Sequence, residues 1–217
     1  MYKRRQELDA NRLKREIKTG IKRPVYLFCG KEDFLIEEAT FTLAKSILPD
    51  GIDDISCSRL QGTEITLQEV LDMADTVSLF SHQRLLIVAD APYFARNSGI
   101  SKANMSRLLN LNSKKEIDAH LIFCATEISQ SFKIVKELTA CGALYRFDAL
   151  NNTAKMAWLR EKVAEYGKRA DGSVLQLFLS QVGSDLRTLA TELEKLVTFL
   201  GNQKEITEES IYAVSSR

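Results

Sequence analysis

A glycine–lysine pair near the start of the chain is the first place where chemistry could be expected. Gly30 and Lys31 follow a short apolar run, as the last residues of a GxxxxGK[ST] phosphate loop would. Such a loop needs backbone N–H groups around the phosphates and a hydroxyl after the lysine for Mg²⁺. Here Glu32 and Asp33 follow the lysine, and their carboxylates would repel a phosphate. The sequence therefore predicts no nucleotide cofactor at this turn.

Other side chains that could act as acids, bases or metal ligands stand apart from one another. Asp90 ends the apolar run 84–89, but alanine and proline follow it instead of a second acid. A turn at the end of a strand is the simpler interpretation of Asp90. His82 and His120 are the only histidines, and neither has a cysteine or histidine nearby at the spacing of metal ligands. The sequence predicts no catalytic residue and no metal site.

Composition and cysteine usage narrow the class of protein. The 217 residues are 45% hydrophobic and carry a net charge of +1, so any contact with nucleic acid must come from a local basic patch. The four cysteines form no CxxC pair, which argues against a zinc site or a disulfide framework and favours the reducing cytoplasm. No run of 18 apolar residues is present in the sequence, so no membrane partner is expected.

A basic stretch lies at the start of the chain. Residues 3–23 contain nine lysines and arginines against three acids, with apolar residues at roughly helical spacing. This N-terminal arm, residues 1–23, is predicted to be helical. Its charges either form a solvated face or contact the phosphates of DNA, and the sequence leaves both open. Aromatic residues that would stack on single-stranded bases are not interleaved with these charges.

The elements that must position these residues alternate between strand and helix over residues 1–150. Several of the apolar runs lack polar alternation, as strands buried on both faces do. The pattern predicts an α/β domain with a parallel sheet and helices on both of its faces. The predicted strands are 25–29, 55–60, 84–89, 119–125 and 143–147, and the helices include 34–48 with Asp33 as N-cap, one after a Thr66–Glu69 capping box, 103–111 and 131–141.

The pattern changes after Leu150. Residues 151–217 are predicted to form a small all-α domain, and residues 148–153 are the predicted hinge between the domains. The helices are expected at 154–168 with Thr153 as cap, 172–182, 185–200 and from Thr207 onward. The chain stops close to its last helix, as expected of a cut between two domains.

The stretch "TVSLFSHQRLLIV" (76–88) places two large apolar residues, Leu79 and Phe80, where a helix should end and a loop begin. They could fill the core of the domain or anchor another protein. Two adjacent side chains at a helix end cannot easily both point inward. With polar neighbours such as Ser78 and Ser81, the pair has the composition of an interface hot spot.

Four blocks in the same order make the whole chain resemble the delta subunit of the bacterial DNA polymerase III clamp loader. They are "RPVYLFCGKEDFLIEEA" (23–39), "ADTVSLFSHQRLLIV" (74–88), "AHLIFCATE" (119–127) and "VGSDLRTLATELEKLVTFLGNQKEIT" (182–207). The resemblance implies an AAA+-like α/β module followed by a helical lid. It also implies a non-catalytic component of the polymerase holoenzyme that does not hydrolyse ATP, and a third, helical collar domain that this chain lacks.

The resemblance assigns a role to the apolar pair. Leu79 and Phe80 match the family's wedge, which enters a hydrophobic pocket on the ring-shaped sliding clamp, and Ser78 matches the residue before it. The implied partners are the sliding clamp (beta) and the gamma/tau and delta prime subunits of the loader, with primed DNA as a candidate. The implied action is mechanical: the subunit binds the open clamp better than the closed clamp, while neighbouring subunits use ATP.

Two other functions remain as alternatives. One is a nucleotide-binding or nucleotide-hydrolysing AAA+ protein, against which the missing phosphate loop argues. The other is a sister loader subunit that lacks ATPase activity and acts as a stator. Such subunits usually carry zinc-binding cysteines, whereas the cysteines here are scattered and the Leu-Phe pair is present.

Overall fold

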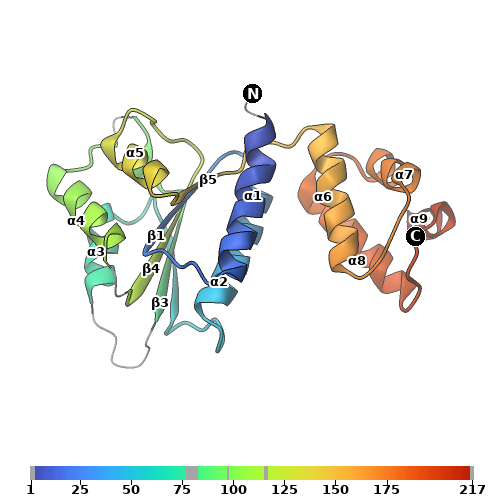
Figure 1. Ribbon diagram of the computed structural model, residues 1–217, viewed down its shortest axis with the longest axis horizontal. Coiled ribbons are helices and arrows are strands. Elements are labelled where there is room, and N and C mark those ends of the chain that lie inside the picture. Colours follow the sequence, from blue (N-terminus) through green and yellow to red (C-terminus); the bar gives the residue numbers. More distant parts are fainter. Residues whose placement is uncertain (1–2, 77–82, 97, 115–116, 216–217) are drawn as a thin grey trace. The chain divides into compact units, whose positions relative to one another are not determined.

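The computed structural model describes residues 3–76, 83–96, 98–114 and 117–215 (Figure 1). The chain divides into two compact units, Met1–Ala149 and Leu150–Arg217, each of which is described by itself. Within the described ranges, no helix is both long enough and apolar enough to cross a membrane.

The first unit is built around a five-stranded parallel sheet in the order β2-β3-β4-β1-β5. Its strands are β1 (Val25–Cys29), β2 (Cys57–Gln61), β3 (Arg84–Ala89), β4 (Ala119–Ala125) and β5 (Leu144–Arg146). Its helices are α1 (Lys3–Lys18), α2 (Asp33–Ile47), α3 (Leu67–Asp75), α4 (Lys102–Asn112) and α5 (Lys133–Ala140), with a 3₁₀ turn at Pro92–Phe94. Helices α1 and α2 lie on one side of the sheet and α3, α4 and α5 on the other (Figure 1). The predicted fold class, a parallel sheet with helices on both faces, is confirmed.

Alternate strand residues form the core on the two faces of the sheet. On the side of α3, α4 and α5, Leu27, Val88 and Phe123 belong to one cluster with apolar residues of those helices. On the other side, Phe28 packs edge-on against Tyr145 and Phe147, with ring centroids 5.5 and 5.4 Å apart. Because both faces are covered, the central strands read as continuous apolar runs in the sequence.

Helix α1 is docked against the sheet. Leu13 is only 3% exposed, and the Arg12 guanidinium lies 4.1 Å over the Tyr145 ring and donates to the Leu144 carbonyl at 2.5 Å. The Glu16 carboxylate accepts hydrogen bonds from the Tyr145 hydroxyl and from Arg23. Burial raises the pKa of Tyr145, so its hydroxyl keeps the proton that it donates. The predicted helix is present, but it packs as part of the domain rather than forming a separate arm.

The described residues of the second unit form helices and one isolated β-bridge, between Arg169 and Glu205. The helices are α6 (Asn152–Glu165), α7 (Gly172–Val182), α8 (Leu186–Leu200) and α9 (Glu208–Ser215). The buried stripe of α8 has helical spacing, with Leu186, Leu189, Leu193, Leu196 and Leu200. The helices that were expected to follow the α/β module are therefore present.

Two predicted helix caps are wrong. Glu32, without a side-chain cap bond, occupies the N-cap of α2, and Asp33 is the first helical residue, where its charge suits the helix dipole. At α6 the Asn151 side chain accepts from the Ala154 N–H at 2.8 Å, so the cap is not Thr153. In each case the N-cap is another polar residue, which lies one or two positions before the predicted one.

Candidate functional site

The turn after β1 is closed by the strands beside it. The Gly30 N–H donates to the Ala125 carbonyl at 3.2 Å, and the Glu32 N–H donates to the Phe147 carbonyl at 3.0 Å. Gly30 has φ +142°, and a Cβ at this position would lie 1.9 Å from the Phe147 oxygen. Glycine is needed here for close approach to a neighbouring strand. The two N–H groups are engaged by protein carbonyls, whereas a phosphate loop keeps such groups free for its ligand.

Carboxylates surround the groove beside this turn. The groove has a volume of about 540 Å³ and lies between α2 and strands β2, β3 and β4. Asp33, Glu37 and Asp90 line it together with Arg59. Asp90 stands in a turn after β3 with φ +47° and accepts from the Gln61 side-chain amide at 2.7 Å. Three carboxylates against one guanidinium make this groove unfavourable for a triphosphate.

Histidine and cysteine do not form a reactive centre among the described residues. His120 is fully buried, its Nδ1 lies 2.7 Å from the Arg23 carbonyl oxygen, and burial lowers its pKa. Burial raises the pKa of the Cys29 thiol to about 12 and that of Cys124 to about 11, so both stay protonated at neutral pH. Within the described ranges, no three potential ligands cluster as a metal site would require. His82 lies outside those ranges.

The predicted interface residues Ser78, Leu79 and Phe80 belong to the segment 77–82, which lies outside the described residues. The structure does describe the two ends of this segment. One end is Thr76, which follows α3, and the other is Gln83, which precedes β3. Since these ends fix where the segment leaves the domain, their contacts form the described part of the candidate site.

Helix α3 begins with the predicted capping box, which is confirmed. The Thr66 hydroxyl accepts from the Glu69 N–H at 3.3 Å, and the Glu69 carboxylate accepts from the Thr66 N–H at 2.8 Å. The helix buries Val70, Leu71 and Ala74 against the core cluster. Both features hold α3 in place, so its last turn presents Thr76 at a fixed position.

The end of α3 is also tied to the neighbouring elements. Arg107 of α4 forms ion pairs of 2.8 Å with Asp72 and with Asp75, and Lys114 lies 3.6 Å from Asp75. The hydrogen bond from Arg107 lowers the pKa of Asp75. From the sheet side, the Arg84 guanidinium donates to the Thr76 carbonyl and approaches the Ala74 carbonyl at 3.4 Å.

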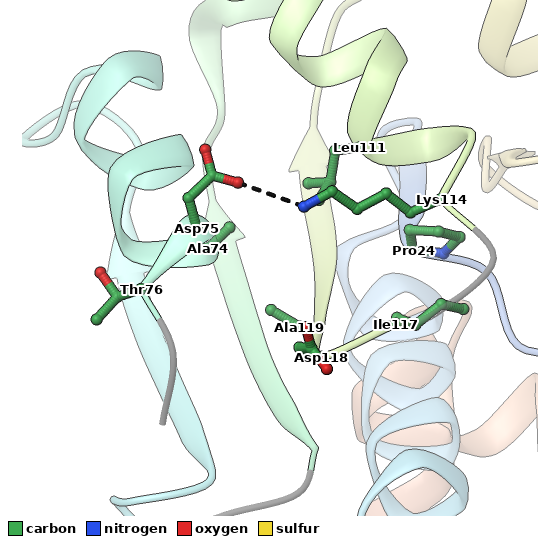
Figure 2. A pocket seen from close by; sticks show the side chains of 9 residues that line it. All are labelled: Pro24, Ala74, Asp75, Thr76, Leu111, Lys114, Ile117, Asp118 and Ala119. Atoms are coloured by element: carbon green, nitrogen blue, oxygen red, sulfur yellow. Dashed lines mark ion pairs between the residues drawn. The ribbon is translucent and has the colours of Figure 1, made fainter. Parts of the chain in front are cut away.

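A small pocket of about 40 Å³ opens beside Thr76 (Figure 2). Lys114 points toward Asp75 across its rim, and Leu111, Ile117 and Pro24 line it. The pocket could hold about one water molecule and no larger ligand. The pocket therefore does not suit capture of a small molecule.

Sequence reasoning did not single out Arg84 and Arg107. A charged residue that opens an otherwise apolar strand was a usable signal for Arg84. No comparable signal marked Arg107, because its partner Asp75 is 32 residues away and their meeting depends on how α3 and α4 pack.

Comparison with known proteins gives one family. The family model "DNA polymerase III, delta subunit" matches residues 26–146, a range that includes segment 77–82 and both of its ends. Among curated proteins, DNA polymerase III subunit delta of Bacillus subtilis (strain 168) is 22% identical over 208 residues, which are 94% of this chain and 60% of that protein. The chain thus spans less than two thirds of the length of this relative.

Among solved structures, the Bacillus subtilis DNA clamp loader delta protein (YqeN) superposes with a TM-score of 0.78 at 20% identity. The match covers 94% of this chain and 61% of that one. Domain III of the Thermotoga maritima replication initiation protein DnaA reaches a TM-score of 0.44 at 12% identity, over 96% of this chain and 90% of that one. The likeness to the delta protein shows the fold, a parallel-sheet module followed by helices.

Proposed function

This chain belongs to the DNA polymerase III delta subunit family, and from that premise we propose that it binds the ring-shaped sliding clamp and favours the clamp's open form during replication. The observation that carries the proposal is the family match over residues 26–146, which contains the apolar pair Leu79 and Phe80. A cytoplasmic location is proposed on the same ground.

Leu79 and Phe80, with Ser78 before them, are proposed as the residues that enter an apolar pocket of the clamp. Burying one such side chain contributes roughly 1.5–3 kcal/mol, so the pair could supply about 3–6 kcal/mol. Supporting this proposal, the Arg84 guanidinium donates to the Thr76 carbonyl and so holds one end of the segment. A segment whose end is already held loses less conformational entropy when it binds.

Clamp opening follows from differential affinity and needs no chemistry in this chain. A ligand moves a two-state equilibrium only by the difference between its affinities for the two states. Moving a ring from 1% to 99% open takes about 5.5 kcal/mol of such difference. The energy available from Leu79 and Phe80 is comparable, provided that their pocket is better formed in the open clamp.

ATP hydrolysis is proposed to belong to neighbouring subunits and not to this chain. The engaged N–H groups of Gly30 and Glu32 and the acidic groove beside them support this. Isothermal titration with Mg-ATP is expected to show no binding at micromolar nucleotide. A clear micromolar isotherm would contradict this part of the proposal.

Assembly with the gamma/tau and delta prime subunits, and any contact with primed DNA, is proposed for the whole protein, because the chain spans only 60% of its Bacillus relative. Clamp binding is proposed to reside in residues 1–217 and can be tested with this chain alone. Immobilised cognate clamp should retain the 217-residue chain from solution, and a clamp with a blocked hydrophobic pocket should not. Equal retention by both clamps would contradict the proposal.

A further inference from the structure

We infer that Arg84 is a positioning residue for clamp binding, because its guanidinium joins the two ends of segment 77–82. The inference rests on the proposed function and names a residue outside the Leu-Phe pair that sets how the pair is presented. The contacts that carry it involve residues 74–76 and 84, all of which the structure describes.

The backbone of Arg84 belongs to the sheet. Arg84 is the first residue of β3, and its N–H donates to the Asp118 carbonyl at 3.0 Å. In the register of β3 and β4 it lies opposite Ala119. Strand β3 continues into residues that are almost fully buried, including Leu85. The Cα of Arg84 is thus a fixed point from which the side chain extends.

The side chain of Arg84 reaches back to the helix on the far side of the segment. Its Nη2 donates to the Thr76 carbonyl, with the Ala74 carbonyl 3.4 Å away. These carbonyls belong to the end of α3, where the last turn leaves acceptors without intrahelical partners. A guanidinium there gains from the negative end of the helix dipole and forms charge-assisted hydrogen bonds. One side chain therefore connects the helix end at Thr76 with the strand start at Arg84.

The ion pairs on the other side of α3 act differently. Arg107 forms ion pairs with Asp72 and Asp75, both of which belong to the helix. Lys22 lies 3.5 Å from the Gln83 side chain, at the limit of a hydrogen bond, on the strand end of the segment. Arg84 spans both ends of the segment, and Arg107, whose ion pairs lie on the helix, provides a matched control.

Joining the ends should matter for affinity. A partner that binds a segment must overcome the conformational entropy of ordering it, and that cost is smaller when the ends are already held together. Removal of Arg84 should therefore weaken clamp binding without removing any residue that enters the clamp pocket.

The test compares Arg84→Met, Arg84→Lys and Arg107→Met with the unchanged 217-residue chain. Methionine keeps the aliphatic stem but donates no hydrogen bond, while lysine keeps the charge without the planar guanidinium whose Nη2 contacts both carbonyls. Affinity for immobilised cognate clamp should fall about tenfold in Arg84→Met, recover in part in Arg84→Lys, and change less than about twofold in Arg107→Met. Binding of Arg84→Met within twofold of the unchanged chain would overturn the inference.

Amide hydrogen exchange of the free protein separates positioning from general stability and does not involve the clamp. In Arg84→Met, exchange should rise at Thr76 and Gln83 while the amides of β1 and β4 stay protected. A rise throughout the domain, with a lower melting temperature, would make Arg84 an ordinary structural residue and overturn the inference. If the unchanged chain fails to bind the clamp, the proposed function fails, and the exchange measurement still decides the role of Arg84.

Discussion

At the scale of single residues, the pKa of Asp75 depends on the contacts that hold the end of α3. It is the last residue of that helix and lies close to two cations, Arg107 at 2.8 Å and Lys114 at 3.6 Å. The hydrogen bond from Arg107 lowers the pKa of Asp75 below its ordinary value of about 3.9. A carboxylate whose pKa is lowered in the folded state adds stability above its unfolded pKa and loses it as pH falls through the folded pKa.

Arg107→Met is therefore expected to raise the pKa of Asp75 toward its ordinary value, as measured by NMR titration of the carboxyl carbon. Because the Asp75 side chain is 49% exposed, the variant should lose no more than about 1 kcal/mol at neutral pH. The stability difference from the unchanged protein should shrink in acid, below the lowered pKa. An unchanged Asp75 titration in the variant would show that Arg107 does not hold this carboxylate.

The part of the site that the sequence could predict follows from local patterns. The four residues Gly30–Asp33 already differ from a phosphate loop in the sequence. The structure adds a second reason, because the N–H groups of Gly30 and Glu32 donate to carbonyls of neighbouring strands. Leu79 and Phe80 attract notice because they are adjacent where the sequence predicts the end of a helix. The role of Arg84 depends on the path of its side chain to carbonyls eight and ten residues earlier, and no sequence pattern encodes that path.

At the scale of elements, α1 shows where a local pattern is insufficient. Its charges and helical spacing predict a helix, but its docking depends on Glu16 meeting Tyr145, 129 residues away. By contrast, strands 25–29, 84–89 and 119–125 begin and end where predicted. A buried strand is a short, continuous apolar run, so its two ends can be located in the sequence. The start of a helix differs from the prediction where consecutive residues could all serve as its N-cap, as at Asn151–Thr153.

Leu13→Ala tests whether α1 contributes to the fold. Since Leu13 is buried, the truncation should lower the free energy of unfolding by about 2–5 kcal/mol in urea titrations. The matched control is Asn11→Ala on the exposed side of the same helix, which should change it by less than about 0.5 kcal/mol. Equal stability of the two variants would mean that α1 is a separate arm after all.

At the scale of the whole molecule, the link between the two units should be the most accessible part of the backbone. Residues 147–151 form no helix or strand, and Asp148 and Ala149 are exposed. Limited proteolysis is expected to cut first within residues 148–153 and to release two fragments that resist further digestion. First cuts inside either unit, with this link among the last sites cleaved, would contradict the predicted hinge.

The measurement that tests the central claim most directly is the affinity of Leu79→Ala/Phe80→Ala for the cognate clamp, by surface plasmon resonance beside a thermal melt. Loss of about 3–6 kcal/mol should weaken binding by about 10²–10⁴ and leave the melting temperature almost unchanged. Phe41→Ala, which removes a 48% exposed aromatic ring from α2, should bind like the unchanged chain. Clamp binding that survives the double change, or a large fall in melting temperature, would contradict the assignment and return Leu79 and Phe80 to the core.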